Sequence, residues 1–406
     1  MTATLLDDPD HRAFLAEDAR RALNLFDASP RAGGGFHGLD PAGQPLPADL
    51  QELHSTTRLV HSYALAQMAG RPDRAGIIDQ GMDFLWNGHR DRDHGGYLWS
   101  VTGDGPVNGI KLAYGHVFVL LAASSAKMAV HPDADRLLDD ITLVLDRHFW
   151  DAQAGLFRDE FTCDWQAFST YRGMNANMHG VEALLAAHEA TGDGEYLTRA
   201  GGILRFFIAG QAAGNDWRIP EHYDADWRPD HAYSGNPMFR PAGTTPGHSF
   251  EMARLLLQWW DLAGRPTGDA VAQATALVRR GLSDAWSDDL GGLVYTLNRD
   301  GGVDNAARYW WPVTEAIGAL AALLKVQPTS EFDGWYRKLW QFAGQHMVDA
   351  RHGGWHHELG PDNQPVMTQF QGKPDIYHAL QADLLPLTPG LSGQAKDLAQ
   401  LQPLGV

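Results

Sequence analysis

Two kinds of helical segment alternate along the chain. One kind is amphipathic, with apolar residues at helical spacing on one face, as in 135–151, 196–211 and 332–349. The other kind is apolar nearly all round and rich in small residues, which is typical of a helix buried on most sides. These apolar segments are 59–70, 115–126, 179–192, 251–264, 314–326 and 377–387. The alternation predicts six inner helices, each preceded by an outer helix.

Turn-like segments rich in glycine and aromatic residues separate the helical pairs and recur along the sequence. They begin at Gly33, His94, Ala154, Gly214, Leu290 and His352. The starts lie about 60 to 75 residues apart, which is a long period for a repeat array. A ring of six helical hairpins therefore predicts an all-α fold, an (α/α)6 barrel, as a single domain over 1–406. An open solenoid is the alternative, but its repeats are usually shorter.

Composition limits the partners of such a protein. The formal charge of -18 works against nucleic acid or an anionic membrane, because both require a basic face. Small neutral ligands remain possible partners. No apolar run approaches the roughly 18 residues of a membrane span. The first residues have neither a basic stretch nor an apolar one, and Cys163 is a single cysteine, so we expect a cytoplasmic location. No feature of the sequence specifies an oligomeric state.

Polar or aromatic residues stand at or near the entry of each expected inner helix. They are Arg58, Tyr114, Asn175 with His179, His248 with Glu251, Trp311 with Glu315, and His378. Successive positions are about 55 to 70 residues apart, so a closed barrel brings them together at one end of its axis. The helix N-termini point at the same place, and their partial positive charge favours a developing oxyanion. The sequence therefore predicts one pocket at this end.

Each of these residues also has a purely structural interpretation. His179 alone is typical of a satisfied core histidine, and the pair His248 and Glu251, three residues apart, is either a base with its orienting group or a local stabilising contact. Arg58 on a buried helix requires a carboxylate or a ligand oxygen. A metal site is not expected, because H-E-x-x-H and a cysteine cluster are both missing from the sequence. The His-rich loops 89–96 and 351–358 are more typical of turns than of metal ligation.

Four ordered motifs extend this pattern into a family resemblance. NANMHGVEA at 175–183, PGHSFEMARLLL at 246–257, YWWPVTEAIGAL at 309–320 and GKPDIYHALQA at 372–382 resemble the N-acylglucosamine 2-epimerase superfamily. The resemblance runs from Thr56 to Leu387. It implies a barrel of six α/α hairpins that acts on free sugars without metal or nucleotide. The last motif is similar to the branch of mannose isomerases and sulfoquinovose isomerases.

The resemblance also implies roles for the entry residues. His248 and His378 would transfer protons, with Glu251 orienting or assisting His248, and His179 would help to open the sugar ring. The implied substrate-binding residues are Arg58, Tyr114, Asn175, Trp311 and Glu315.

The activity implied is that of an aldose-ketose isomerase, first of all one for D-mannose and D-fructose. The reaction removes a proton beside a carbonyl, forms an enediol and returns a proton to the adjacent carbon. Imidazole suits both steps, because its pKa of about 6.5 makes it a base and an acid near neutral pH, and no cofactor is required. The alternatives are a sulfoquinovose isomerase, a sugar 2-epimerase, a glycoside hydrolase with two carboxylates, and a sugar-binding protein without activity.

Overall fold

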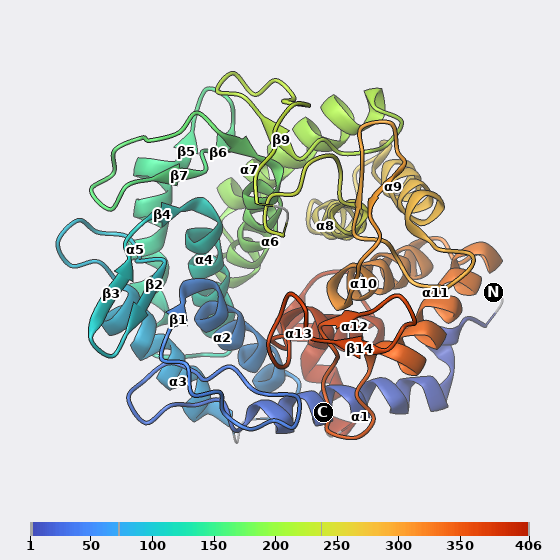
Figure 1. Cartoon of the computed structure of the whole chain (residues 1–406), viewed down its shortest axis with the longest axis horizontal. Helices are drawn as coiled ribbons and strands as arrows, with labels where there is room; N and C mark the ends of the chain where they lie inside the picture. The colour runs from blue at the N-terminus through green and yellow to red at the C-terminus, as the bar shows by residue number, and fades with distance from the viewer. Residues whose placement is uncertain (1–2, 72–73, 237, 405–406) are drawn as a thin grey trace.

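The computed structural model describes residues 3–71, 74–236 and 238–404, and within them twelve helices form two concentric rings. The outer helices are α1 (Pro9–Phe26), α3 (Ala75–Phe84), α5 (Ala134–Val144), α7 (Gly194–Leu204), α9 (Ala270–Ala285) and α11 (Ser330–Phe342). The inner helices are α2 (Leu53–Met68), α4 (Ala113–Met128), α6 (Met174–Thr191), α8 (Pro246–Leu262), α10 (Trp310–Val326) and α12 (Tyr377–Leu387). Figure 1 looks into the inner ring, with the outer helices around it. The predicted (α/α)6 barrel is confirmed.

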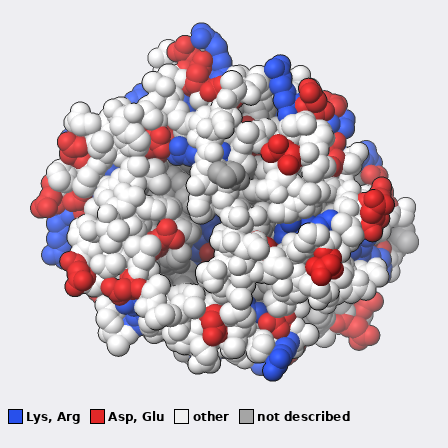
Figure 2. Space-filling view, in the orientation of Figure 1, with Lys and Arg blue, Asp and Glu red and all other residues white. Residues whose placement is uncertain are grey.

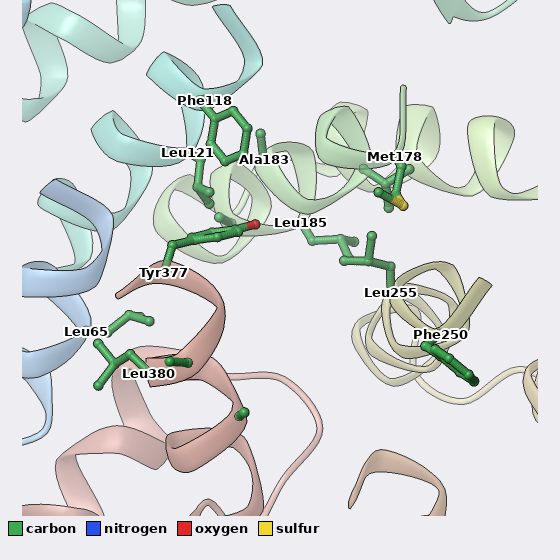
Figure 3. Packing of buried hydrophobic residues seen from close by; sticks show 14 of the residues in the cluster. Leu65, Phe118, Leu121, Met178, Ala183, Leu185, Phe250, Leu255, Tyr377 and Leu380 are labelled. Atoms are coloured by element: carbon green, nitrogen blue, oxygen red, sulfur yellow. The ribbon is translucent and has the colours of Figure 1, made fainter. Parts of the chain in front are cut away.

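The burial of the two rings follows the hydrophobic pattern. On α10, every residue from Pro312 to Leu324 is buried, because this helix has neighbours on all sides. On α5, Leu138 and Ile141 are buried while Leu143 is 69% exposed, as expected of a helix with one face in water. Figure 3 shows inner-ring side chains converging, with Tyr377 of α12 extending toward α6. Truncating a buried leucine in such a core to alanine costs about 2–5 kcal/mol.

Four outer helices end in a π-helical segment followed by a tight turn. These segments are η3 (Leu85–His89), η4 (Leu145–Phe149), η5 (Arg205–Gln211) and η7 (Ala343–Met347). After η3, the Oδ1 atom of Asp91 accepts the backbone N–H groups of Asp93 and His94. Gly96 in this turn has φ +68°, and a Cβ there would lie 2.6 Å from the Trp165 ring. The recurring glycine-rich segments are therefore turns, as the sequence predicts.

Short antiparallel strands line the end of the barrel at which the inner helices begin. The three-stranded sheets are β1 (Gln51–Glu52), β2 (Ser100–Thr102) and β3 (Gly105–Asn108), and β12 (Arg308–Tyr309), β13 (Glu358–Leu359) and β14 (Pro365–Val366). The pairs are β4 (Lys111–Leu112) with β7 (Glu160–Phe161), β5 (Trp150–Asp151) with β6 (Leu156–Phe157), β8 (Arg172–Gly173) with β9 (His222–Tyr223), and β10 (Thr296–Leu297) with β11 (Val303–Asn305). Several strands lead directly into an inner helix and so fix its first turn.

The C-terminal segment closes the opposite end of the barrel. It contains α13 (Gln394–Leu398) and the 3₁₀ helix η8 (Ala399–Leu404). Further 3₁₀ helices in the described part of the chain are η1 (Leu5–Asp7) and η6 (Ala212–Gly214). The backbone N–H of Gly393 donates to Glu189 at the end of α6, and Lys325 at the end of α10 donates to the carbonyl of Gly390 at 2.8 Å. Access to the barrel axis is therefore from the side of the helix N-termini.

No helix among the described residues is both long enough and apolar enough to span a bilayer.

Candidate active site

The predicted site residues lie in the first two turns of the inner helices, where a set of contacts joins them. The guanidinium of Arg58 donates to the hydroxyl of Tyr114 at 2.8 Å, and the ring of Tyr114 lies 5.3 Å from that of His179. On the other side, the ring of Trp311 lies 5.0 Å from His248 and 6.0 Å from His378, measured between ring centroids. Figure 2 shows the face at which the inner helices begin, and this face is hollowed near its centre.

His248 is held by a carboxylate that the sequence did not indicate. Its Nδ1 atom lies 3.0 and 2.9 Å from the two oxygens of Glu221. Because a carboxylate only accepts, Nδ1 carries the proton, and Nε2 is left as the basic nitrogen. The expected partner, Glu251, faces His179 instead, at 3.4 Å. The prediction that Glu251 orients His248 is therefore wrong, because Nδ1 of His248 is bonded to Glu221.

A short pair of strands holds Glu221 in place. Glu221 directly precedes β9, whose His222 pairs with Gly173 of β8. The carbonyl of Glu221 accepts the backbone N–H of Met174, the first residue of α6. Its carboxylate also accepts the N–H of Thr245, just before α8, at 3.0 Å. The carboxylate is therefore fixed between the starts of two inner helices.

His378 is held within the inner ring itself. Its Nδ1 atom lies 2.8 Å from Oε1 of Glu315 on α10, and the other oxygen of Glu315 accepts from Arg254 of α8 at 3.1 Å. Burial lowers the pKa of His378, and the hydrogen bond that its Nδ1 donates to Glu315 opposes that shift without cancelling it. His378 is therefore a neutral imidazole at neutral pH. Each oxygen of Glu315 thus accepts a hydrogen bond from a neighbouring side chain, which places Glu315 to hold His378, while its predicted contact with substrate stays a prediction.

His179 lies between two carboxyl groups. Its Nδ1 atom is 3.4 Å from Glu251 and 3.6 Å from Glu182, and burial lowers the pKa of His179 to about 4. Burial, together with the charges of Glu315 and Glu182, raises the pKa of Glu251 well above its ordinary value, which favours the protonated acid. Neutral His179 and protonated Glu251 can thus each offer a proton to a sugar oxygen.

The same three side chains have the donor atoms for a metal ion. The ligand atoms of His179, Glu182 and Glu251 all lie within 4.8 Å of one another. The guanidinium of Arg254, however, lies 3.8 Å from Glu251 and 4.0 Å from Glu182. Its positive charge repels a cation, and burial favours the protonated form of Glu251, which removes one metal ligand. The arrangement therefore favours proton transfer over metal binding.

Arg58 forms an ion pair with Asp375 and is enclosed by aromatic rings. Its Nη1 atom lies 3.3 Å from the carboxylate of Asp375, and its guanidinium carbon is 4.7 Å from the ring centroids of both Phe118 and Tyr377. Burial works to raise the pKa of Asp375, but the charge of Arg58 outweighs it and holds that pKa below the ordinary range. The carboxylate that the sequence required for Arg58 is thus present.

Asn175 is a predicted binding residue that has an unoccupied acceptor atom. Its Oδ1 is buried without a hydrogen-bond partner among the described residues. An unpaired buried carbonyl oxygen costs about 1–3 kcal/mol, so this position favours a ligand that donates a hydrogen bond. His188, further along the same helix, donates from Nδ1 to the carbonyl of Asp193 and takes no part in the site.

Several site residues were missed in the sequence, for different reasons. Glu182 follows His179, and Arg254 follows Glu251, at a helical spacing of three, which is a usable signal. Asp375 precedes His378 by three residues in the same motif. Glu221 gives no such signal, because it lies in a loop 27 residues before its partner.

The comparisons with known proteins agree with this architecture. The chain belongs to the N-acylglucosamine 2-epimerase (GlcNAc 2-epimerase) family, whose sequence pattern matches residues 34–382. It is an enzyme of the isomerase class. The family resemblance seen in the four motifs is confirmed.

Relatives named D-mannose isomerase match nearly the whole chain. The one from Thermobifida fusca is 40% identical over 392 residues, which cover 94% of this chain and 96% of that protein. The one from Pseudomonas cannabina pv. alisalensis is 38% identical over 405 residues, 98% and 97% of the two chains. A crystal structure of D-mannose isomerase superposes with a TM-score of 0.88 at 30% identity, covering 92% of this chain and 97% of that one. A cellobiose 2-epimerase from Spirochaeta thermophila, at 22% identity and TM-score 0.82, covers 93% and 96% and shares the fold.

Proposed function

We propose that this enzyme interconverts D-mannose and D-fructose as free sugars. One observation carries the proposal: His248 and His378 each have Nδ1 held by a carboxylate, and both rings contact Trp311. Each imidazole thus has its second nitrogen available for a proton at the same end of the barrel. The relatives named D-mannose isomerase support this choice of substrate.

The reaction needs one proton transfer from carbon and one to carbon on the same open-chain sugar. One neutral imidazole removes the proton from C2 of the aldose, the electron pair of that bond forms the C1–C2 double bond, and the imidazolium passes its proton to the carbonyl oxygen at C1. The second imidazole then takes the O2 proton, C2 becomes the carbonyl, and the imidazolium so formed gives a proton to C1. We assign these transfers to His248 and His378, because a positioned imidazole exchanges protons efficiently near neutral pH.

The remaining entry residues are assigned to ring opening and binding. His179, with protonated Glu251 at 3.4 Å, can move the proton between the ring oxygen and the anomeric hydroxyl. Arg58 and Tyr114 can hold the carbonyl oxygen, where one well-placed donor is worth roughly 3 kcal/mol in the transition state. Asn175 accepts from a hydroxyl through its unoccupied Oδ1.

The charges around the site favour a neutral sugar over an anionic one. Arg58 is already paired with Asp375, and Arg254 with Glu315, so neither guanidinium is free to neutralise a phosphate or sulfonate. The further carboxylates Glu182 and Glu221 would repel such a group. This argument ranks mannose above sulfoquinovose as the substrate.

Proton NMR of a sugar panel in deuterated water tests the proposal. Mannose, glucose, fructose, N-acetylglucosamine and sulfoquinovose are each incubated with the enzyme, and the products are identified. We expect mannose and fructose to interconvert faster than any other pair. Glucose formed from mannose without fructose would instead indicate a 2-epimerase, and binding without conversion would indicate a sugar-binding protein.

A cytoplasmic location remains part of the proposal, supported by the acidic charge and the single cysteine.

A further inference from the structure

We propose that Asp91, His94 and Cys163 form a binding site for a zinc-like divalent cation on the rim of the barrel, outside the catalytic pocket. Among the described residues, the donor atoms of these three side chains lie within 4.8 Å of one another. Asp91 and His94 belong to the turn after η3, and Cys163 follows β7. A carboxylate, an imidazole and a thiolate are the ligands that zinc prefers in proteins.

The spacing of the donor atoms fits a tetrahedral ion. Sγ of Cys163 lies 3.2 Å from Oδ2 of Asp91 and 3.8 Å from Nδ1 of His94, and that Nδ1 lies 3.4 Å from the same Oδ2. Zinc bonds of about 2.0 to 2.3 Å at tetrahedral angles place such ligand atoms about 3.3 to 3.6 Å apart. The three atoms thus form one face of the required tetrahedron, and a water completes it.

The surrounding chain holds the three ligands in this arrangement without a metal. Oδ1 of Asp91 is fixed by two backbone N–H groups, so Oδ2, which also accepts from Lys111, is the oxygen that faces Cys163 and His94. The indole N–H of Trp165 donates to the carbonyl of His94 at 2.8 Å and so ties the turn to the segment that carries Cys163. A Cβ on Gly109 would lie 2.9 Å from the sulfur, so glycine there leaves room for Cys163.

A buried ammonium limits the affinity of the site. Nζ of Lys111 lies 2.7 Å from Oδ2 of Asp91 and competes for the same oxygen. Binding also requires Cys163 to release its thiol proton to solvent as the sulfur–metal bond forms. With three protein ligands and an opposing charge, we expect a dissociation constant of roughly micromolar, weaker than that of a four-ligand structural zinc site.

The barrel contains a second copy of the turn that serves as an internal control. After η7, His352 lies 3.2 Å from Oδ2 of Asp349, and Lys373 lies 2.6 Å from that atom. The carboxylate, imidazole and ammonium are thus repeated, but no cysteine is present there, because Cys163 is the single cysteine of the chain. The two turns therefore differ in the thiol of Cys163, and we expect metal binding at the turn that has it.

Titration of the full chain with zinc, and with cobalt as a spectroscopic probe, tests the site. We expect one equivalent of cobalt to give a thiolate-to-metal charge-transfer band, and zinc to displace it. Cys163→Ser should abolish the band and weaken zinc binding at least tenfold, and His94→Ala should weaken binding similarly. His352→Ala, the matched control, should change neither. Zinc binding of equal affinity in the wild type and Cys163→Ser, or cobalt binding without the band, would overturn the proposal.

Discussion

The two histidines assigned to proton transfer are held in the same way by different parts of the fold. His378 and its carboxylate Glu315 lie on adjacent inner helices, and Arg254 of a third helix completes the network. His248 lies on an inner helix, but its carboxylate Glu221 lies in a loop anchored by β8 and β9. Closing the barrel therefore suffices to build the first pair, whereas the second also requires correct pairing of two short strands.

The difference extends to the environment of each ring. The side chain of His378 is 6% exposed and that of His248 is 12% exposed. Burial and a network of charged groups tune His378, while His248 lies nearer the mouth and stacks on Trp311. In this barrel, His378 is thus held entirely by inner helices, whereas His248 depends on Glu221 in the loop before β9.

The largest expected effect comes from removing either imidazole. Replacing His378 or His248 by Asn should lower kcat by roughly 100-fold or more, the usual size of a general acid–base contribution, with a smaller effect on KM. Steady-state kinetics with mannose measure it. His188→Ala is the matched control, because His188 lies on an inner helix outside the site and should retain activity.

These kinetics are informative for variants that melt at the wild-type temperature. A folded His378→Asn enzyme that converts mannose at the wild-type rate would remove His378 from the mechanism. A folded His248→Asn enzyme that converts mannose at the wild-type rate would likewise show that the pair of His248 and Glu221 is not needed for turnover.

Changing the carboxylates should have a smaller effect and tests the comparison itself. In Glu221→Gln and Glu315→Gln, the imidazole loses the carboxylate that fixes its Nδ1 proton, so we expect kcat to fall by roughly 10-fold or more, but by less than in the matching His→Asn variant, because the other tautomer then becomes populated. KM should change little, because neither carboxylate has been placed against substrate. Glu251→Gln is the contrasting variant. It should lower kcat through ring opening, because Glu251 lies beside His179. A Glu221→Gln enzyme that keeps the wild-type kcat would mean that His248 does not depend on Glu221.

The sequence predicted most of the site because the repeat fixes its geometry. Once six apolar helices are expected to surround one axis, residues such as Tyr114, His179 and Trp311 must meet at their entries. The partner of His248 could not be predicted in this way. Helical spacing favoured Glu251, but β8 and β9, two residues each, bring Glu221 to the ring from outside the helices. Pairs this short leave almost no alternating pattern to detect.

Removing the unpaired acceptor of Asn175 should affect binding more than turnover. We expect Asn175→Ala to raise KM roughly 2- to 10-fold, the range of one neutral hydrogen bond, with kcat within a factor of about 3 of wild type. Asn175→Asp, which keeps an acceptor oxygen, should retain more affinity than alanine. Equal losses in both variants would show that the acceptor is not what binds the sugar.

The smallest effect, a shift in titration, separates the two pairs most finely. Because burial lowers the pKa of His378, its imidazole should titrate below pH 6.5 in NMR spectra of histidine-labelled enzyme. Glu315 raises that pKa, so Glu315→Gln should move the midpoint to still lower pH, while Glu221→Gln should leave it in place. The signal is assigned by its loss in His378→Asn. A midpoint that rises in Glu315→Gln would contradict the assigned interaction.

The central claim is that two histidines exchange protons with solvent and with adjacent carbons of the sugar. The measurement is the deuterium content at C1 of fructose formed from mannose in deuterated water, after exhaustive treatment of the enzyme with EDTA. Proton transfer through an enediol to a second, solvent-exchanged imidazole predicts full activity and close to one deuterium at C1. Fructose that carries no deuterium at C1 would contradict the account, because hydrogen would then move directly between the carbons. Conversion that stops after chelation would also contradict it, because a metal ion would then take part in the reaction.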